Sequence, residues 1–289
     1  MKLLAISGGI DSMVLAHMYK DDPEIILAHV NYNFRSDSHI DQKLVENFAQ
    51  KHHKQLEILV LDGTKPKGNL QNWARQQRYQ FFSQIYKQYG CSTLIVAHHQ
   101  DDNLETCLMQ NQKNPLKLFY GIKPTQQLFG MQIERPLIAK NYWKKQLYAY
   151  GRYHRIAFHE DSTNQSDLYE RNKLRNQQLK PLSLRQKSTL LNLFAKLNQA
   201  KQQLLEQIES DFALWQENAF STKIWTQLPT QAYLIPKFIN HFAKQINLNQ
   251  AIIKNIGAFI KANQTNKKFL LNNNYFLSKT NHQLQMGKI

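Results

Sequence analysis

Six residues near the N-terminus have the composition of a loop that binds phosphate groups: Ser7-Gly8-Gly9-Ile10-Asp11-Ser12. Adjacent glycines can adopt positive φ and expose consecutive backbone N–H groups, and the serine hydroxyls add donors without bulk. The Asp11 carboxylate would repel a bare phosphate, so it predicts a divalent cation such as Mg²⁺ between the two. In GxxxxGK[ST] loops a lysine follows the glycine, but no lysine follows the glycines here. The alternative is a tight structural turn capped by Ser12.

A second polar cluster fills residues 97–106, which read Ala-His-His-Gln-Asp-Asp-Asn-Leu-Glu-Thr. Its two histidines and three carboxylates can supply metal ligands, a general base and orienting hydrogen bonds. The alternative is helix capping by Asp101 or Asp102, with Glu105 as a solvated acid in the first turn. Capping leaves the pair His98 and His99 unexplained, so the cluster favours a chemical role.

Two pairs of arginines have helical spacing. Arg75 and Arg78 are three residues apart, and Arg171 and Arg175 are four apart, so each pair lies on one helix face. Taken alone, such pairs are usually solvated surface.

The elements that must position these residues alternate along the chain. Apolar runs at residues 2–6, 25–30, 55–61 and 93–97 predict strands, and helical spacing predicts helices over 13–19, 40–48 and 68–89. This order predicts an α/β fold with a doubly wound, mostly parallel sheet covered by helices on both faces. Both polar clusters follow strands, so they are expected at the carboxyl edge, where such sheets bind ligands.

The pattern changes near Pro181. Residues 131–138 and 141–154 still predict a strand and a helix, but helical spacing then dominates over 190–215, 233–245 and 250–262, followed by a hairpin at 269–284. We therefore expect a catalytic domain at 1–182 and a smaller, mainly helical domain at 183–289.

Charge indicates an anionic partner. The 289 residues carry a net charge of +16, and residues 218–289 contain nine lysines and no Asp or Glu. Such a surface favours nucleic acid as the partner, although general richness in lysine is the alternative explanation.

No apolar run reaches the length of a membrane span, which predicts a cytoplasmic protein. The two cysteines, Cys91 and Cys107, do not form a CxxC pair.

The motifs together resemble a known family. Ser7 to Ser12 resembles the SGGxDS loop of the N-type ATP pyrophosphatases, or PP-loop proteins, which have the adenine nucleotide alpha hydrolase-like fold and cleave ATP between its α and β phosphates. Residues 98–106 resemble the HHxDDxxET signature of the tRNA lysidine synthases. Three further segments resemble that family in the same order: His29-Val30-Asn31 with Arg35, Ser38 and Asp41; Ala74 to Tyr79; and Asp161 to Asn164 with Arg171, Asn172 and Arg175.

This resemblance implies a reaction. The wobble cytidine in the CAU anticodon of tRNA(Ile) attacks the α-phosphate of ATP through its C2 oxygen, and free L-lysine then displaces AMP. It implies that Ser7 to Ser12 hold the phosphates with Asp11 near Mg²⁺ and that adenine lies near His29 and Val30. Asp102 is then expected either to take the proton of the lysine amine or to make a second metal contact, with His99 as the next candidate. The arginines implied to contact tRNA or the lysine carboxylate are Arg75, Arg78, Arg171 and Arg175.

Two other functions stay open on the sequence. A tRNA thiolase of the same superfamily shares the adenylation step, but such enzymes generally need paired cysteines or an iron–sulfur cluster. A non-catalytic RNA-binding protein with a relic nucleotide pocket would keep the basic surface and lose turnover. The oligomeric state is also open, a homodimer included.

Overall fold

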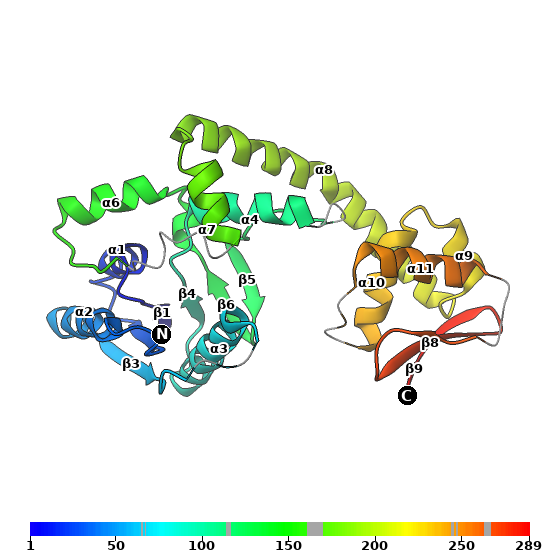
Figure 1. The fold of residues 1–289 in the computed structure, drawn as a ribbon, viewed down its shortest axis with the longest axis horizontal. Coiled ribbons are helices and arrows are strands. Elements are labelled where there is room, and N and C mark those ends of the chain that lie inside the picture. The colour runs from blue at the N-terminus through cyan, green and yellow to red at the C-terminus, as the bar shows by residue number, and fades with distance from the viewer. Residues whose placement is uncertain are drawn as a thin grey trace. The chain divides into compact units, whose positions relative to one another are not determined.

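The computed structural model describes residues 1–64, 66, 68–113, 117–160, 170–243, 246, 248–262 and 267–289. It divides into two compact units, one of residues 1–115 and 120–194 and the other of residues 116–119 and 195–289 (Figure 1). The functional division predicted at residue 182 stays a prediction.

The first unit is built on a six-stranded sheet with the strand order β3-β2-β1-β4-β6-β5. All neighbouring strands are parallel except β5, which pairs antiparallel with β6 at the edge. The strands are β1 (Lys2–Ala5), β2 (Ile25–Asn31), β3 (Gln55–Val60), β4 (Thr93–Ile95), β5 (Thr125–Leu128) and β6 (Met131–Glu134). This arrangement confirms the predicted doubly wound, mostly parallel sheet.

Helices cover both faces because successive strand residues point to opposite sides. Leu4 and Leu27 pack with α1 (Ile10–Met18), α2 (Ser38–Lys51) and α6 (Lys144–Tyr153). Leu3 and Ile26 pack on the other face, with α3 (Leu70–Gln88). A third cluster joins α4 (Gln100–Lys113) to α7 (Glu170–Leu174), to the π-helical turn η2 (Arg175–Leu179) and to Phe194.

The expected strand at 131–138 is shorter in the structure. It ends at Glu134, and Pro136 begins a short helix, α5 (Pro136–Ala139). Proline lacks the N–H that a strand ladder needs, and it fits the first turn of a helix, so the apolar run changes structure there. Strand β5 was not predicted because its sequence, Thr-Gln-Gln-Leu, is polar and mostly exposed at the sheet edge.

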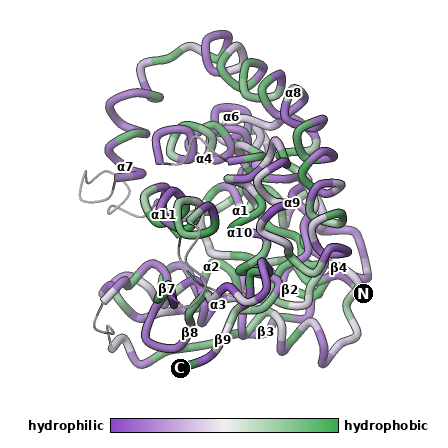
Figure 2. The backbone as a smooth tube through the Cα atoms, turned by 90° about the vertical axis from the view of Figure 1, so that its right-hand side faces the viewer, coloured by the Kyte–Doolittle hydropathy of each residue, from purple (hydrophilic) through white to green (hydrophobic). Residues whose placement is uncertain are grey.

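The second unit is mainly helical, as predicted. Its helices are the later part of α8 (Leu184–Glu217), α9 (Thr222–Gln227), α10 (Gln231–Phe242) and α11 (Gln250–Lys261). The alternation of apolar and polar stretches along α8 is visible in Figure 2. Trp215, Trp225 and Phe238 are fully buried in one core with Ile256.

The chain ends in an antiparallel sheet of β7 (Phe269–Leu270), β8 (Tyr275–Thr280) and β9 (Gln283–Lys288). The hairpin expected at residues 269–284 is therefore a three-stranded sheet that extends to Lys288. Within the described ranges, no helix is both long and apolar enough to cross a bilayer.

Candidate active site

The segment that joins β1 to the first turn of α1, residues Ser7 to Ser12, is called the cradle from here on. Gly8 has φ +89°, and Gly9 is the N-cap of α1. Glycine has no side chain to cap the first turn, so that turn presents its backbone donors and its partial positive charge at the loop. Ser12 does not cap the helix; its hydroxyl donates to the Gly9 carbonyl (2.9 Å) and accepts the N–H of Ser7 (3.0 Å). Ser12 therefore leaves the N-terminus of α1 uncapped, and backbone donors at such a helix end can bind an anion.

Arg35 and Asp41, from the segment that follows β2, pack against this loop together with His159. A Cβ on Gly8 would lie 2.9 Å from both Cα and Cβ of Asp41. The Asp41 carboxylate accepts from Arg35 Nη2 (2.6 Å) and lies 3.1 Å from Nδ1 of His159, whose backbone N–H donates to the Gly8 carbonyl (3.1 Å). Only glycine fits at position 8, because Asp41 lies directly against it and is held in place by Arg35 and His159.

The structure brings together the three residues predicted to be catalytic. Nε2 of His99 lies 3.6 Å from Oδ1 of Asp11 and 3.4 Å from Oδ2 of Asp102. Asp102 also accepts the backbone N–H of His99 (3.1 Å). Asp11 comes from the first turn of α1, His99 from the segment between β4 and α4, and Asp102 from the first turn of α4. The parallel sheet therefore assembles them at its carboxyl edge.

The charges of this group reinforce one another. Burial alone would raise the pKa of Asp102, but His99, His98 and Arg171 outweigh it and lower that pKa to about 2. Burial likewise opposes the charge on Asp11, whose pKa is nevertheless lowered by His99 and Lys144. For His99 the carboxylates of Asp102 and Asp11 overcome burial and raise the pKa. The cluster therefore holds two carboxylates and a histidine that readily carries a proton.

The Arg171 and Arg175 pair joins the same cluster. Glu105 is buried, and its oxygens accept from Nε of Arg171 (2.7 Å) and from Nε and Nη2 of Arg175 (2.5 and 2.9 Å). Nη2 of Arg171 lies 3.3 Å from Asp102. Each arginine side chain stays more than a third exposed, so the guanidinium groups pair with Glu105 and remain reachable by a ligand.

Other predicted residues lie apart from this cluster. His29 is almost fully buried, with Nδ1 2.9 Å from the Ile6 carbonyl, and Val30 packs on the opposite face of the sheet. Arg75 and Arg78 are exposed on α3, with their guanidinium carbons 4.6 and 5.9 Å from the ring centre of Tyr79. The predicted segment 161–164 lies outside the described residues.

Sequence reasoning missed two lysines at the site. Nζ of Lys144 lies 2.8 and 2.7 Å from the two oxygens of Asp11, and Nζ of Lys187 lies 2.6 Å from Oδ1 of Asp101. Neither belongs to a recognisable pattern in a chain so rich in lysine. The only available signal was the missing lysine in the phosphate loop.

The donor set fits a Mg²⁺ ion that arrives with phosphate. Among the described residues, no group of three or more His, Cys, Asp or Glu could hold a metal by itself. Mg²⁺ is usually held by one or two carboxylates together with substrate phosphates, so Asp11 beside the cradle is sufficient.

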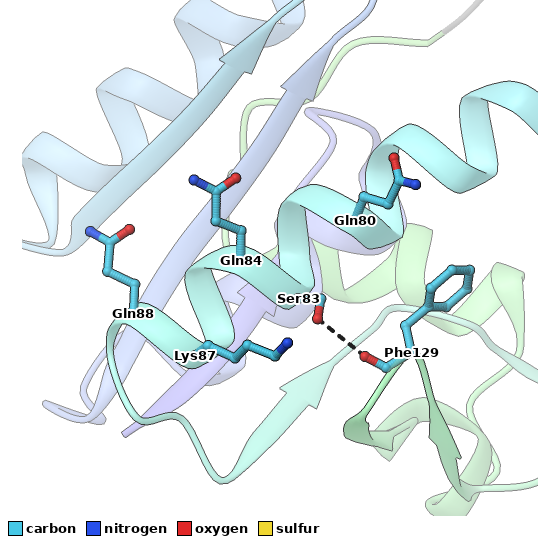
Figure 3. Close-up of a pocket in the computed structure, with 6 residues that line it drawn as sticks. All are labelled: Gln80, Ser83, Gln84, Lys87, Gln88 and Phe129. Carbon is cyan, nitrogen blue, oxygen red and sulfur yellow. Dashed lines mark hydrogen bonds between the residues drawn. The ribbon is translucent and has the colours of Figure 1, made fainter.

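A separate surface hollow lies along α3. Figure 3 shows it lined by Gln80, Ser83, Gln84, Lys87, Gln88 and Phe129, with the Ser83 hydroxyl donating to the Phe129 carbonyl (3.1 Å). None of the predicted site residues lines it.

Comparison with known proteins agrees with this geometry. A family model described as a PP-loop domain matches residues 1–182. The tRNA(Ile)-lysidine synthase of Mycoplasmopsis pulmonis is 39% identical over all of both chains. That of Mesomycoplasma hyopneumoniae is 34% identical over 96% of this chain and 93% of its own, and that of Mycoplasma genitalium is 32% identical over 98% and 96%.

A solved structure supports the fold. The U34-tRNA thiolase NcsA from Methanococcus maripaludis with its [4Fe-4S] cluster matches 68% of this chain and 71% of its own, with a TM-score of 0.53 and 16% identity. At that identity the likeness extends to the fold alone. The end-to-end matches at 32–39% identity are closer, and with the PP-loop match they show that the chain belongs to the tRNA(Ile)-lysidine synthase family.

Proposed function

We propose that this protein ligates lysine to C2 of the wobble cytidine in the CAU anticodon of tRNA(Ile), with ATP converted to AMP and pyrophosphate. One observation carries the proposal: the Ser7 to Ser12 loop brings Asp11 to His99 and Asp102 in a chain that matches a named lysidine synthase from end to end. ATP use follows from the PP-loop domain.

In the first step, the C2 oxygen of cytidine attacks the α-phosphorus and pyrophosphate leaves. Residues Ser7 to Ser12 hold the phosphates with backbone and hydroxyl donors, which stabilise the charge that develops on the leaving group. Mg²⁺ held by Asp11 would supply further neutralisation of that charge. The adenine ring is proposed to lie at the end of β2. Because His29 is buried, the backbone there is the surface offered to the ring.

In the second step, the lysine amine attacks C2 and AMP leaves. A free amine has a pKa of about 10.4, so it must lose a proton first. We propose that Asp102, or else His99, accepts that proton from the lysine amine. With a pKa of about 2, Asp102 is a strong partner for the incoming ammonium, and it is a weak base until the surrounding charges change. Arg171 and Arg175 are proposed to contact the lysine carboxylate or tRNA, because guanidinium forks match both groups.

Two rival functions fit the structure less well. A thiolase needs reactive thiols or a cluster, but both Cys91 and Cys107 are buried, and burial raises the pKa of Cys107 to about 12. A relic RNA-binding protein would not require a carboxylate and a histidine in contact beside an open phosphate loop.

The reaction itself is the direct test. Purified protein is incubated with ATP, Mg²⁺ and transcribed tRNA(Ile), together with either labelled lysine or a labelled sulfide donor. We expect label from lysine in the RNA, with one AMP and one pyrophosphate for each lysine incorporated. Sulfur label would support the thiolase, and RNA binding without turnover would support the relic.

We propose that the basic second unit binds the tRNA body. Lys223, Lys254 and Lys268 are exposed there, whereas Lys279 is buried and donates to the carbonyls of Phe259 (2.7 Å) and Ala262 at the end of α11. Lys279 therefore serves the fold, whereas phosphates can reach the three exposed lysines, although the Nζ of Lys268 also lies 4.1 Å from the ring centre of Phe276.

Replacing Lys223, Lys254 and Lys268 together with glutamine should weaken tRNA binding and flatten its dependence on salt. Each lost phosphate contact reduces the slope of log K against log salt by about 0.7 to 0.9. Binding is measured by filter retention between low and physiological salt. A control variant, in which Lys43, Lys51 and Lys87 of the first unit become glutamine, loses the same charge and should keep the slope. Equal slopes in both variants would contradict a special role for the second unit.

A further inference from the structure

Lys144 places an ammonium group at the phosphate loop, although it lies 133 residues from Asp11 in sequence. Its Nζ contacts both oxygens of the Asp11 carboxylate, at 2.8 and 2.7 Å. The two side chains are 36% and 30% exposed, so a ligand in the cradle can reach them. The ring of Tyr148 lies 5.4 Å from the same Nζ and adds a cation–π contact.

The backbone of Lys144 is fastened to the second polar motif. Lys144 is the first residue of α6, and its N–H donates to Oδ2 of Asp101 (2.9 Å). Oδ1 of Asp101 is in turn held by Lys187. The Gln100 side chain donates to the Ile138 carbonyl and to Oδ1 of Asn141, both at 2.9 Å. Gln100 and Asp101 thus fix the segment that carries Lys144, which gives these two motif residues a positioning role.

The charges at the loop require a change of partners when ATP arrives. The loop offers neutral donors, and its one charged side chain is the Asp11 carboxylate, which repels phosphate. If Mg²⁺ takes Asp11, the ammonium of Lys144 loses its partner and needs another anion close by. Phosphate oxygens are the nearest candidates, and a compact ammonium is a suitable ligand for them.

We propose that Lys144 is a phosphate-binding residue that moves from Asp11 onto the β- and γ-phosphate oxygens of ATP and stays with the pyrophosphate released. The inference rests on the proposed function and deepens it, because it supplies the lysine that the loop lacks. No covalent bond of Lys144 changes in this exchange. Lys187 does not compete for the role, since it is 15% exposed and holds Asp101.

The test compares Lys144→Met with Lys145→Met, a matched loss of charge at the next, exposed residue of α6. Calorimetric titration with pyrophosphate and with AMP, in the presence of Mg²⁺, measures binding without turnover. We expect Lys144→Met to weaken pyrophosphate binding about 10- to 100-fold, the effect of one charged hydrogen bond, and to leave AMP binding within about twofold. Lys145→Met should bind both ligands as the unaltered protein does, and Lys144→Arg should recover part of the lost affinity.

Steady-state kinetics gives a second measurement. The KM for ATP and the inhibition constant of pyrophosphate should rise together in Lys144→Met. Unchanged pyrophosphate binding would overturn the inference, and so would an equal loss for pyrophosphate and AMP, which would mean that Lys144 only maintains the shape of the loop. If the unaltered protein binds neither ATP nor pyrophosphate, it is the proposed function that fails, so the two failures are distinguishable.

Discussion

Replacing Asp11 with alanine is expected to reduce lysidine formation by roughly 10³-fold, in line with the loss of an electrostatic group aimed at the transition state. Asp11 contacts both His99 and Lys144 and is the carboxylate within the loop itself, so its removal would take away the protein ligand proposed for Mg²⁺. Release of labelled pyrophosphate from ATP in the presence of tRNA and lysine measures the effect.

The same change should cost little stability. The Asp11 side chain is partly exposed. Without it, His99 keeps Asp102 as a partner, and the part-exposed ammonium of Lys144 can be hydrated by water. Thermal melting should therefore stay close to that of the unaltered protein. Asp21→Ala, at an exposed carboxylate just beyond α1, is the control and should keep full turnover. Normal pyrophosphate release from Asp11→Ala would refute the assignment of the loop.

Replacing Gly8 with alanine is expected to damage both the fold and the binding of ATP. An alanine at φ +89° costs about 1 to 2 kcal/mol in backbone strain. Its Cβ would also lie 2.9 Å from Asp41, which Arg35 holds in place, so the backbone of the cradle must shift. We expect a fall in melting temperature together with at least a tenfold loss of ATP affinity, measured by thermal melting and calorimetric titration.

A matched control separates strain from collision. Gly130 also has positive φ, at +74°, but a Cβ there would meet no heavy atom within 4 Å. Gly130→Ala should therefore show the strain without the shift, with a smaller fall in melting temperature and unchanged ATP affinity. If both variants lost stability equally and bound ATP equally well, the shape of the cradle would not depend on the packing of Asp41 against Gly8.

The residues that sequence predicted well are those whose neighbours in the chain determine them. Leu3, Leu4, Ile26 and Leu27 belong to short apolar runs, and such runs specify buried parallel strands. The strand order then places the ends of β1 and β4 side by side, so the meeting of Asp11 with His99 follows from local patterns plus a general rule of α/β sheets.

The residues that sequence could not predict are those whose partners lie far along the chain. Nothing near Lys144 indicates that its ammonium meets Asp11, and nothing near Glu105 indicates that two arginines about 70 residues later neutralise it. The packing of Asp41 against Gly8 is of the same kind. Such contacts depend on how loops and helices close over the sheet edge, and hydrophobic periodicity does not encode that closure.

The burial of both thiols has a practical consequence. Cys91 lies in the core between the sheet and α3, and Cys107 lies on the buried side of α4, in the cluster that α4 forms with α7. An alkylating reagent can reach either sulfur only when the surrounding core opens. The alkylation rate of each cysteine therefore reports how often its own core opens. Trapping with iodoacetamide, read peptide by peptide, would time the opening of these two regions separately, without any introduced label.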